Sequence, residues 1–394
     1  MTRVGILGGG QLALMLAESF VALGADVAIF DPDPDAPARR RYALGDSKPY
    51  EDRAALRRFL DACDVVTYEF ENVPAAAIRT ARSNTPIYPS LDVLEACQHR
   101  SREKETIIAA GAPTVAFVSV SERSQLRTAL ASFGFPAVVK TAAGGYDGKG
   151  QRTYSKLAEV DEAHFPPDAP LIVEERVRIE RELSCIVARR GKEAVTLPIF
   201  ENHHTAHILD VTLCPAPIPP ALARKATKLA TQIAVALDVQ GILTVELFVA
   251  HGRAGHGVAI RDSTARLYVN ELAPRPHNSG HVSRIACDWS QFDLQARAVL
   301  GMLLPNPRLV VDGTAFMANL LGDLWPKPQA ATATFGALAA EAGVRELYLY
   351  GKREARAGRK MGHVSGVART ATAAFERAEA LRRAARLSGP RPLR

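Results

Sequence analysis

The pattern of apolar and polar positions predicts a strand, a helix and a second strand close to the N-terminus. Residues 3–10 start as an apolar run and end in three glycines, which is typical of a strand leading into a tight turn. Apolar residues then recur at helical spacing from Gln11 to Leu23, and Gly24 is placed to end that helix. Residues 26–31 have the pattern of another strand. The segment therefore predicts a β-α-β unit with backbone amides exposed at a helix N-terminus.

The glycine turn of this unit is typical of nucleotide-binding folds without being specific to one ligand. Gly8 to Ala13 fits the pattern G-x-G-x-x-A, and Asp31 lies near the ribose position of a dinucleotide site. An NAD-dependent dehydrogenase is therefore one interpretation that this segment leaves open. The same turn serves other phosphate-bearing ligands, because its amides can bind any phosphate oxygen.

Strands and helices continue to alternate along the chain. A helix is expected at 50–60 and a strand at 65–70, and Glu71 follows at the end of the strand, where open α/β sheets bind ligands. A helix at 91–96 closes the first domain near residue 97, and a charged helix covers 98–110. Further strands are predicted at 115–118, 171–173, 180–187 and 346–350, and further helices at 122–133 and 221–237, while 315–321 is a hydrophobic stretch.

The stretch from Val138 to Gln151 combines a buried strand with a glycine-rich loop. The β-branched run ends in Lys140, and the following loop carries four glycines and Lys149 before Gln151. Glycines let amide groups approach phosphate oxygens without a Cβ in the way, and lysines supply positive charge. A surface hairpin loop has the same local composition, so this stretch alone leaves both interpretations open.

Two later strands, at 242–249 and 267–272, each carry one acid inside an apolar run. These acids are Glu246 and Glu271. Two antiparallel strands can point both carboxylates to one spot, and buried carboxylates without a partner are costly, so they require a cation. We therefore expect a magnesium site on this hairpin. The loop at 273–281 follows directly and is rich in side chains that hold small anions.

Composition narrows the function classes. With 394 residues the chain is long enough for two or three domains, and 47% hydrophobic and 23% charged residues are typical of a soluble globular protein. Five scattered cysteines favour free thiols in the cytoplasm, and we expect neither a membrane partner nor a signal peptide. The net charge of +7 is spread along the chain without interleaved aromatic residues, which favours small anionic substrates over nucleic acid.

Five segments, in order along nearly the whole chain, resemble ATP-grasp enzymes and, more closely, the N5-carboxyaminoimidazole ribonucleotide synthetases of purine synthesis. They are Gly8-Gly9-Gly10-Gln11-Leu12, Tyr68-Glu69-Phe70-Glu71-Asn72-Val73, the loop from Gly144 to Gln151, the segment from Asn270 to His281, and Gly358-Arg359-Lys360-Met361-Gly362-His363. The resemblance implies a mixed α/β and α+β fold. Its parts are a Rossmann-like pre-ATP-grasp domain at 1–97, an ATP-grasp small lobe at 98–177, a large lobe at 178–310 and a small C-terminal domain at 311–394.

The resemblance also implies that ATP and Mg²⁺ are held between the two lobes. Arg100 and Lys140 would contact the phosphates, the segment 174–177 would line the adenine pocket through backbone groups, and Glu182 would hold the ribose. The residues implied in nucleotide binding are Arg100, Lys140, Gly145, Tyr146, Asp147, Gly148, Lys149, Gly150, Gln151, Glu174, Glu175, Arg176, Val177, Glu182, His204, Asn270 and Glu271. Those implied in metal binding are Glu246, Glu271 and Asn270.

On the substrate side, the resemblance implies that Arg275 and His277 hold bicarbonate beside the γ-phosphate. Carboxyphosphate would form there and release CO2 next to the amine of aminoimidazole ribonucleotide. We expect three catalytic residues, with Asp147 orienting that amine and His277 assisting proton transfer beside Arg275. The residues implied in ribonucleotide binding are Gly10, Gln11, Leu12, Tyr146, Asp147, Lys149, Lys352, Arg359 and Lys360.

Other enzymes of the same superfamily are the nearest alternative, for example a formate-dependent glycinamide ribonucleotide transformylase. The sequence also departs from the family in two places. Ala13-Leu14 stands where the family usually has Gly-Arg, which weakens the case for phosphate contacts at that helix, and 251–266 lengthens the hairpin between the two acidic strands. The resemblance further implies a homodimer.

Overall fold

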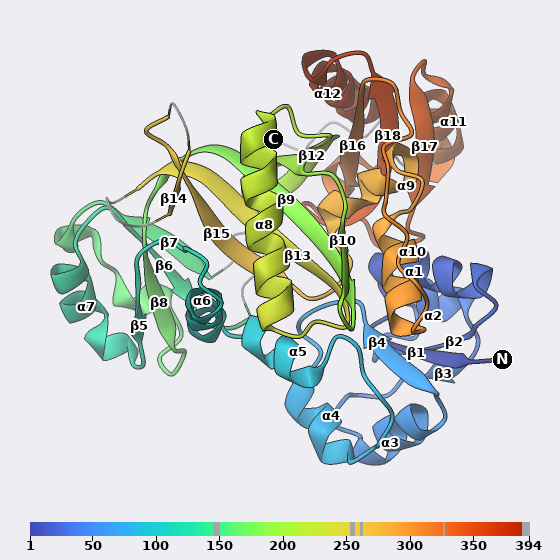
Figure 1. Ribbon diagram of the computed structural model, residues 1–394, viewed down its shortest axis with the longest axis horizontal. Helices are drawn as coiled ribbons and strands as arrows, with labels where there is room; N and C mark the ends of the chain where they lie inside the picture. The colour runs from blue at the N-terminus through green and yellow to red at the C-terminus, as the bar shows by residue number, and fades with distance from the viewer. Residues whose placement is uncertain (145–149, 253–256, 261–262, 326–327, 388–394) are drawn as a thin grey trace.

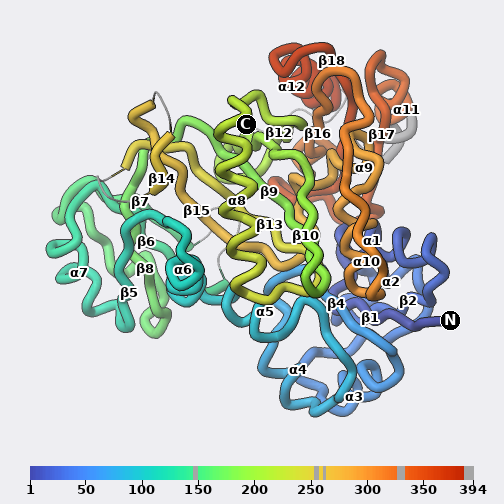
Figure 2. The backbone as a smooth tube through the Cα atoms, in the orientation of Figure 1, coloured from blue at the N-terminus to red at the C-terminus, as the bar shows by residue number. Residues whose placement is uncertain are grey.

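The computed structural model describes residues 1–144, 150–252, 257–260, 263–325 and 328–387. Figure 1 shows three parts: the N-terminal domain at the lower right, a small lobe at the left and a large sheet through the centre that continues to the C-terminal elements at the upper right. The tube in Figure 2 shows the same arrangement, with α10 (Gln291–Val299) from the later part of the chain lying beside the N-terminal helix α1 (Gln11–Ala22). Within these residues, no helix is long and apolar enough to cross a membrane.

The N-terminal domain is a parallel sheet in the order β3-β2-β1-β4. Helix α1 (Gln11–Ala22) packs on one face, together with α10 (Gln291–Val299) from later in the chain, and α3 and α4 pack on the other face. The predicted β-α-β unit is therefore present. The element bounds are β1 Arg3–Leu7, β2 Asp26–Phe30, α2 Pro37–Arg41, β3 Gly45–Asp46, α3 Arg53–Asp61, β4 Val65–Tyr68, α4 Ala75–Ala81 and α5 Leu91–Cys97.

The small lobe is an antiparallel sheet in the order β5-β8-β6-β7, with α7 packed on its apolar face. Helix α6 (Arg100–Ala109) connects it to the first domain. The glycine-rich loop joins β6 to β7, so Lys140 and Gln151 lie opposite each other in the register. The bounds are β5 Phe117–Val120, η1 Arg123–Gln125, α7 Leu126–Phe133, β6 Ala137–Thr141, β7 Gln151–Tyr154, η2 Leu157–Glu159, η3 Glu162–His164 and β8 Leu171–Glu175.

The large sheet runs in the order β14-β15-β13-β9-β11-β12-β16-β18-β17, with β10 paired to β9. Helix α8 covers one face, and η4 (Asn278–Val282) and α10 lie against the other. The bounds are β9 Arg178–Arg190, β10 Glu193–Thr196, β11 Phe200–Thr205, β12 Ile208–Cys214, α8 Pro220–Ala236, β13 Gly241–His251, β14 Val258–Ala259, β15 Arg266–Ala273, α9 Ser283–Ala286, β16 Thr314–Leu321, η5 Gly322–Leu324, α11 Pro328–Ala340, β17 Val344–Leu349, β18 Lys360–Ala368 and α12 Ala371–Leu387.

The C-terminal strands extend this sheet instead of forming a sheet of their own. Strand β16 pairs with β12, as in Val211 opposite Ala318, and β18 and β17 follow outward. The predicted boundary at 310/311 therefore crosses a continuous sheet, whereas the boundary at 177/178 falls between β8 and β9. Backbone hydrogen bonding to the large lobe fixes the C-terminal elements in place.

The glycine turn after β1 is shaped by a side chain from the neighbouring strand end. The carboxylate of Glu69 accepts hydrogen bonds from the amides of Gly10 at 2.7 Å and Ala13 at 3.0 Å. Gly8 has a φ of +94°, and a Cβ there would lie 2.5 Å from Cγ of Glu69. Gly9 donates to Asp31 at 2.6 Å. The turn is therefore closed around two carboxylates of the same domain.

We predict that Gly8→Ala lowers the free energy of unfolding by about 3 kcal/mol, because a positive φ costs about 1 kcal/mol and the clash with Glu69 adds about 2 kcal/mol. Urea unfolding followed by circular dichroism measures the change. Gly24→Ala is the matched control, because its φ is +80° and nothing lies within 4 Å of the added Cβ. Equal losses of unfolding free energy in the two variants would show that the clash between the added Cβ and Glu69 does not destabilise the protein.

Candidate active site

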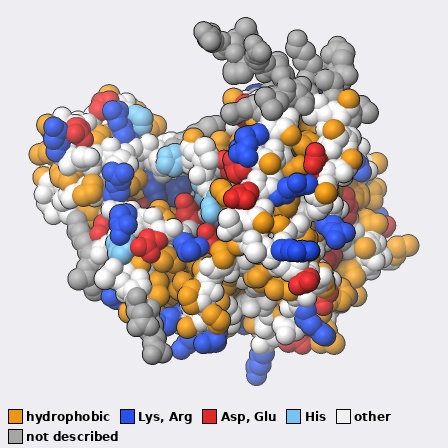
Figure 3. Space-filling model, turned by 90° about the horizontal axis from the view of Figure 1, so that it is seen from above, with side chains coloured by type: hydrophobic (Ala, Val, Ile, Leu, Met, Phe, Trp, Pro, Cys, Tyr) orange, Lys and Arg blue, Asp and Glu red, His pale blue; other side chains and the backbone are white. Residues whose placement is uncertain are grey.

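The candidate site lies where the small lobe, the hairpin of β13 and β15, and the end of β4 meet. Figure 3, which views the molecule from above, shows acidic, basic and histidine side chains together along the hollow between the small lobe and the rest of the molecule. The site therefore draws charged groups from segments that are distant in the sequence.

The centre of the lobe junction is a buried ion cluster of Lys104, Lys140 and Glu174. Lys140 Nζ lies 2.6 Å and Lys104 Nζ 3.3 Å from the Glu174 carboxylate. Burial by itself would raise the pKa of Glu174, but the two ammonium groups outweigh it and lower the pKa from 4.5 to about 2. Lys140 is thus held at the end of β6 by a carboxylate from β8, the neighbouring strand.

Helix α6 turns a charged face toward this cluster. Arg100, Glu103 and Lys104 share that face by their helical spacing, and Glu103 and Lys104 are only 2% and 1% exposed. Glu103 accepts a hydrogen bond from the amide of Leu272 at 2.7 Å, and Lys104 donates to Thr114 Oγ1 at 3.0 Å. Burial and the nearby Glu271 carboxylate raise the pKa of Glu103 well above its ordinary value. The helix is therefore fixed to the hairpin by polar contacts.

The two predicted metal-binding acids lie side by side. Glu246 on β13 is directly opposite Glu271 on β15, and a bulge at this point places Asn270 Nδ2 3.5 Å from Glu246. Directly paired residues of antiparallel strands point to the same sheet face. Arg100 contacts Glu271 at 3.3 Å, and His277 contacts Glu246 at 3.0 Å. Each carboxylate therefore has its own positive or donating neighbour.

These oxygen donors fit a magnesium ion. Burial would raise the pKa of Glu246, but the hydrogen bond from His277 and the positive charges around it lower the pKa overall, so the group is ionised at neutral pH. Among the described residues, no set of three or more His, Cys, Asp or Glu side chains is arranged to hold a metal. Two carboxylates and an amide leave the remaining coordination positions to phosphate and water, as is common for Mg²⁺.

The loop after β15 brings Arg275 and His277 to the boundary with the N-terminal domain. Arg275 forms an ion pair with Glu71, which follows β4. Burial would raise the pKa of Glu71, but Arg275 lowers it. The loop backbone is held from behind, because Gln291 Oε1 accepts from the His277 amide at 2.8 Å and Gln291 Nε2 donates to its carbonyl at 2.7 Å. Arg275 and His277 therefore face the hairpin acids from a rigid support.

The basic C-terminal segment, residues 352–360, lies over the glycine turn. Lys352 is close enough to Glu69 for their charges to interact, and its Nζ donates to the carbonyl of Lys360 at 2.9 Å. Arg353 pairs with Asp35 at 2.7 Å. Burial, followed by the charge of Arg359, lowers the pKa of Lys352 to about 8. The structure thus brings together the two segments that were predicted to share one phosphate.

At the far end of the site, Glu182 and His204 are paired. His204 Nδ1 lies 3.0 Å from Glu182, and although burial lowers the pKa of His204, this hydrogen bond raises it overall. Glu175 and Arg176 use their amides to bind Ala116 and Pro136, and Val177 packs against Tyr268 and Ala250. The chain therefore leaves β8 and crosses between the lobes with the amides of Glu175 and Arg176 already engaged.

Comparison with known proteins agrees with this arrangement. Residues 1–98 match the ribonucleotide synthetase preATP-grasp domain, residues 105–292 the ATP-grasp domain, and residues 315–377 the phosphoribosylaminoimidazole carboxylase C-terminal domain. The chain is 37% identical over 367 residues to the N5-carboxyaminoimidazole ribonucleotide synthase of Staphylococcus aureus, covering 92% of this chain and 91% of that protein. The chain belongs to the N5-carboxyaminoimidazole ribonucleotide synthase family.

Solved structures of this synthase family have the same fold. The Staphylococcus aureus enzyme complexed with ADP superposes with a TM-score of 0.83 at 34% identity, covering 97% of both chains. The Aspergillus clavatus enzyme in complex with ADP and 5-aminoimidazole ribonucleotide superposes with a TM-score of 0.84 at 28% identity, covering 98% of both chains. The predicted fold class and family are therefore confirmed, whereas the roles of individual site residues stay predictions.

Several predictions for this synthase family member fall on the loop after β6. Gly150 and Gln151 are described, and Gln151 Nε2 lies 3.3 Å from His207. Gly145, Tyr146, Asp147, Gly148 and Lys149 lie outside the described residues. The proposed role of Asp147 therefore stays a prediction.

The structure changes the interpretation of the first turn. The amide of Gly10 was expected to bind a substrate phosphate, but it donates to Glu69, and the Gly9 amide donates to Asp31. Asp31 was also the ribose-binding candidate of the dehydrogenase alternative, and it serves here as a turn acceptor. Burial raises the pKa of both Asp31 and Glu69. Since carboxylates occupy these amides, the argument for a dinucleotide at this turn loses its basis.

Sequence reasoning did not find Lys104, Glu103, Glu69 or Gln291. A charged helix start is usually a solvated face, so nothing local marks Glu103 and Lys104 as buried. Glu69 stood in a segment used for the resemblance, but its partner turn is more than fifty positions away. The part played by Lys104 becomes visible only in its contact with Glu174, which joins α6 to β8.

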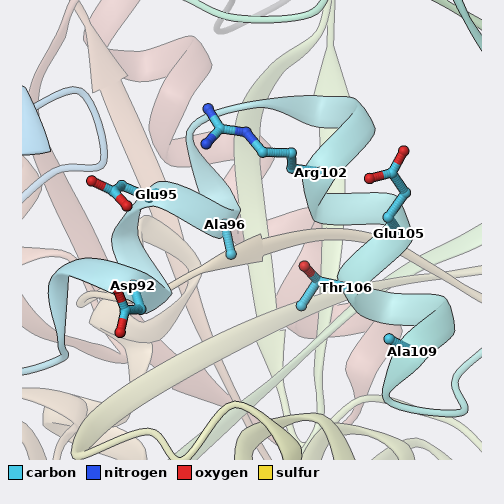
Figure 4. A pocket seen from close by; sticks show the side chains of 7 residues that line it. All are labelled: Asp92, Glu95, Ala96, Arg102, Glu105, Thr106 and Ala109. Atoms are coloured by element: carbon cyan, nitrogen blue, oxygen red, sulfur yellow. The ribbon is translucent and has the colours of Figure 1, made fainter. Parts of the chain in front are cut away.

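A shallow groove elsewhere on the surface is distinct from this site. It lies between α5 and α6, and Figure 4 shows its lining residues, which are Asp92, Glu95, Ala96, Arg102, Glu105, Thr106 and Ala109. Its volume is about 410 Å³. Asp92 and Glu95 are already paired with Arg79. The face of α6 that lines the groove is opposite to the face that carries Arg100, Glu103 and Lys104.

We predict that Glu174→Gln lowers the free energy of unfolding at pH 6 by about 3 kcal/mol, because two buried ammonium groups lose their counter-ion. A folded pKa below the ordinary value gives stability that is present above pH 4.5 and is lost as the pH falls toward 2. The gap between wild type and variant should therefore close over that range. Urea unfolding at a series of pH values measures it.

Glu105→Gln is the control for this experiment, because Glu105 is exposed on the outer face of the same helix. Its unfolding curves should follow the wild type at every pH. A gap for Glu174→Gln that stays constant down to pH 2 would contradict the ion cluster.

Proposed function

We propose that this protein is an ATP-dependent carboxylating ligase of purine biosynthesis. It converts 5-aminoimidazole ribonucleotide, bicarbonate and ATP into N5-carboxyaminoimidazole ribonucleotide, ADP and phosphate. The observation that carries the proposal is the register that sets Glu246 opposite Glu271, with Arg100, Arg275 and His277 around them. Family membership over 92% of the chain supports the same reaction.

The nucleotide occupies the junction between the lobes. Lys140 and Arg100 bind its phosphates, and their charges are already oriented by Glu174 and Glu271. Glu182 accepts from the ribose hydroxyls, with His204 holding its carboxylate in place. Oriented charges of this kind stabilise a transferring phosphoryl group, because they need no rearrangement as the negative charge shifts.

The cofactor of the reaction is Mg²⁺, held by Glu246, Glu271 and Asn270. When bound, it neutralises charge on the phosphates during transfer. Arg100 and His277 contact the outer sides of the two carboxylates and keep them in place. Oxygen ligands and a shared face support this assignment.

Bicarbonate lies beside Arg275, whose charge offsets the repulsion between two anions. Its oxygen attacks the γ-phosphorus of ATP, the bond to ADP breaks, and carboxyphosphate forms. Carboxyphosphate then splits into CO2 and phosphate, and the amine of the ribonucleotide takes up the CO2 and loses a proton. Asp147 orients that amine in our proposal. Confinement of the three reactants at one junction supplies most of the remaining rate.

The ribonucleotide phosphate binds to the basic C-terminal segment. Lys352, Arg359 and Lys360 come from this segment, which lies over the first turn. Gln11 and Leu12 at the start of α1 complete the site. Because Glu69 occupies the Gly10 amide, the lysines and arginine supply most of the attraction for the phosphate.

We also propose that the protein is a cytoplasmic homodimer. The support for the compartment is the five cysteines, all of which are free thiols, as is usual in a reducing environment. Support for the dimer comes from the family resemblance.

We predict that purified protein releases ADP from ATP only when aminoimidazole ribonucleotide, bicarbonate and magnesium are all present. Glu271→Gln should lower kcat at least about 100-fold, because half of the paired carboxylate charge is lost. A coupled assay for ADP, with the carboxylated product followed by mass spectrometry, measures both. ADP release that depends instead on formate and glycinamide ribonucleotide would overturn the assignment.

We predict that the KM for the ribonucleotide rises about tenfold from pH 7 to pH 9, because the charged fraction of an amine with a pKa of about 8 falls by that factor. Lys352→Arg keeps its charge throughout, so its KM should stay flat. Initial rates at varied ribonucleotide concentration measure both. A wild-type KM that does not change with pH would remove Lys352 from the phosphate site.

A further inference from the structure

A chain of buried polar side chains crosses the large sheet and ends at His277. Thr212 on β12 donates to Asn202 Oδ1 at 3.2 Å, and Asn202 Nδ2 on β11 donates to Ser184 Oγ at 3.1 Å. Ser184 on β9 lies 2.8 Å from Ser279 Oγ. Ser279 Oγ in turn lies 2.8 Å from His277 Nδ1. The chain therefore links three strands to a residue of the candidate active site.

This chain lies where the polar part of a sheet face, which carries Glu182 and Glu246, meets the apolar core beneath η4. Ser184 lies on the same face of β9 as Ile186, and Asn202 lies on the same face of β11 as Phe200, because residues two apart in a strand share a face. Both apolar residues belong to the core beneath η4. Ser184 and Ser279 are fully buried. A polar group in such a place is costly unless it is hydrogen-bonded, so each link depends on the next. The chain is therefore ordered as one unit.

Close approach of η4 to the sheet makes the contact possible. Gly280 follows Ser279, and a Cβ on it would lie 2.6 Å from Cδ1 of Ile186. The lack of a side chain at that position lets Ser279 reach Ser184. Gln291 holds the His277 backbone on the other side.

The direction of the hydrogen bonds is set from the His277 end. A backbone N–H can only donate, so the amide of Ser279, 3.4 Å from His277 Nδ1, requires a lone pair on that nitrogen. The hydroxyl of Ser279 then donates to Nδ1 and accepts from Ser184, which in turn accepts from Asn202 Nδ2. Both donors require a lone pair on Nδ1, so the ring proton is on Nε2, which faces Glu246 Oε1 at 3.0 Å.

We propose that Ser279, Ser184 and Asn202 are positioning residues that fix His277 as the neutral tautomer protonated on Nε2. His277 then acts as a hydrogen-bond donor that orients the Glu246 carboxylate, and it does not take up the proton released by the substrate amine. This replaces the proton-transfer role that the sequence analysis expected for His277. The inference rests on the proposed function only in giving Glu246 a role in catalysis.

The proposed tautomer of His277 has a consequence for the geometry of Glu246. His277 engages Oε1 at 3.0 Å, whereas Oε2 has only the longer contact from Asn270 Nδ2 at 3.5 Å, so Oε2 keeps more capacity to bind a ligand. Outer residues that orient a ligating carboxylate commonly change rates or affinities by 10- to 100-fold when they are removed. The chain therefore connects the interior of the sheet to the geometry of the paired acids.

Nitrogen NMR of the protein labelled with ¹⁵N-histidine tests the proposal without any substrate. Proton-bearing and lone-pair nitrogens have well-separated shifts, and the His277 signals are assigned by their loss in His277→Gln. We expect wild type to show a lone pair on Nδ1 and a proton on Nε2. Ser279→Ala removes the hydroxyl donor, so its spectrum should shift toward the other tautomer, and Ser184→Ala should give a smaller shift in the same direction.

Steady-state kinetics provide the second measurement. Ser279→Ala should lower kcat about tenfold while the KM values for ATP and the ribonucleotide stay within about twofold, because binding groups are untouched. Ser365→Ala is the matched control, since Ser365 is a fully buried serine of β18 outside the chain of donors. It should keep the wild-type spectrum and rate.

The NMR result stands apart from the reaction. A wild-type His277 with its proton on Nδ1, or a Ser279→Ala spectrum identical to wild type, overturns the proposal even if carboxylation is observed. The expected spectra with no carboxylation would support the donor chain and reject the proposed function.

Discussion

The whole site depends on placing two like charges beside each other. The register of β13 and β15 sets Glu246 opposite Glu271, and two carboxylates at that separation repel unless cations surround them. Arg100 from α6 pairs with Glu271, and Arg275 from the loop after β15 adds positive charge near both acids. The paired carboxylates therefore require arginines close by, and these arginines come from different parts of the fold.

At the lobe junction a carboxylate is likewise held between positively charged side chains. Glu174 sits between Lys104 and Lys140, and Lys104 also reaches the carbonyl of Asn270 at 3.4 Å. A buried ion cluster of this kind contributes little to net stability compared with apolar packing, but it fixes geometry, because breaking any member leaves a charge unpaired. The cluster therefore matters for geometry, since it fixes the position of Lys140 relative to the hairpin acids.

The sequence pattern was enough to predict those site residues whose character can be recognised within a single strand. A single acid in an apolar run identified Glu246 and Glu271, because alternation shows which residues share a face. It could not give the bulge that brings Asn270 toward Glu246, since a bulge depends on the partner strand. Strands β11 and β12 were missed because the polar residues of the donor chain, Asn202 and Thr212, lie on a buried face and break the alternation.

The first turn shows the limit of motif reasoning in a different way. Three glycines there were taken to admit a phosphate, yet the partner they admit is Glu69 from the adjacent strand end. A local motif specifies close approach and not the identity of the group that approaches.

The structure also explains why this chain can carry Ala13-Leu14 where its family usually has Gly-Arg. Ala13 is fully buried and Leu14 is 2% exposed, both in the core that joins α1 to α10. The Ala13 amide already binds Glu69. A side chain at position 14 therefore packs into the domain interface instead of facing the turn. In our proposal the positive charge for the substrate phosphate comes from the basic C-terminal segment, which is held over this turn by the continuous sheet.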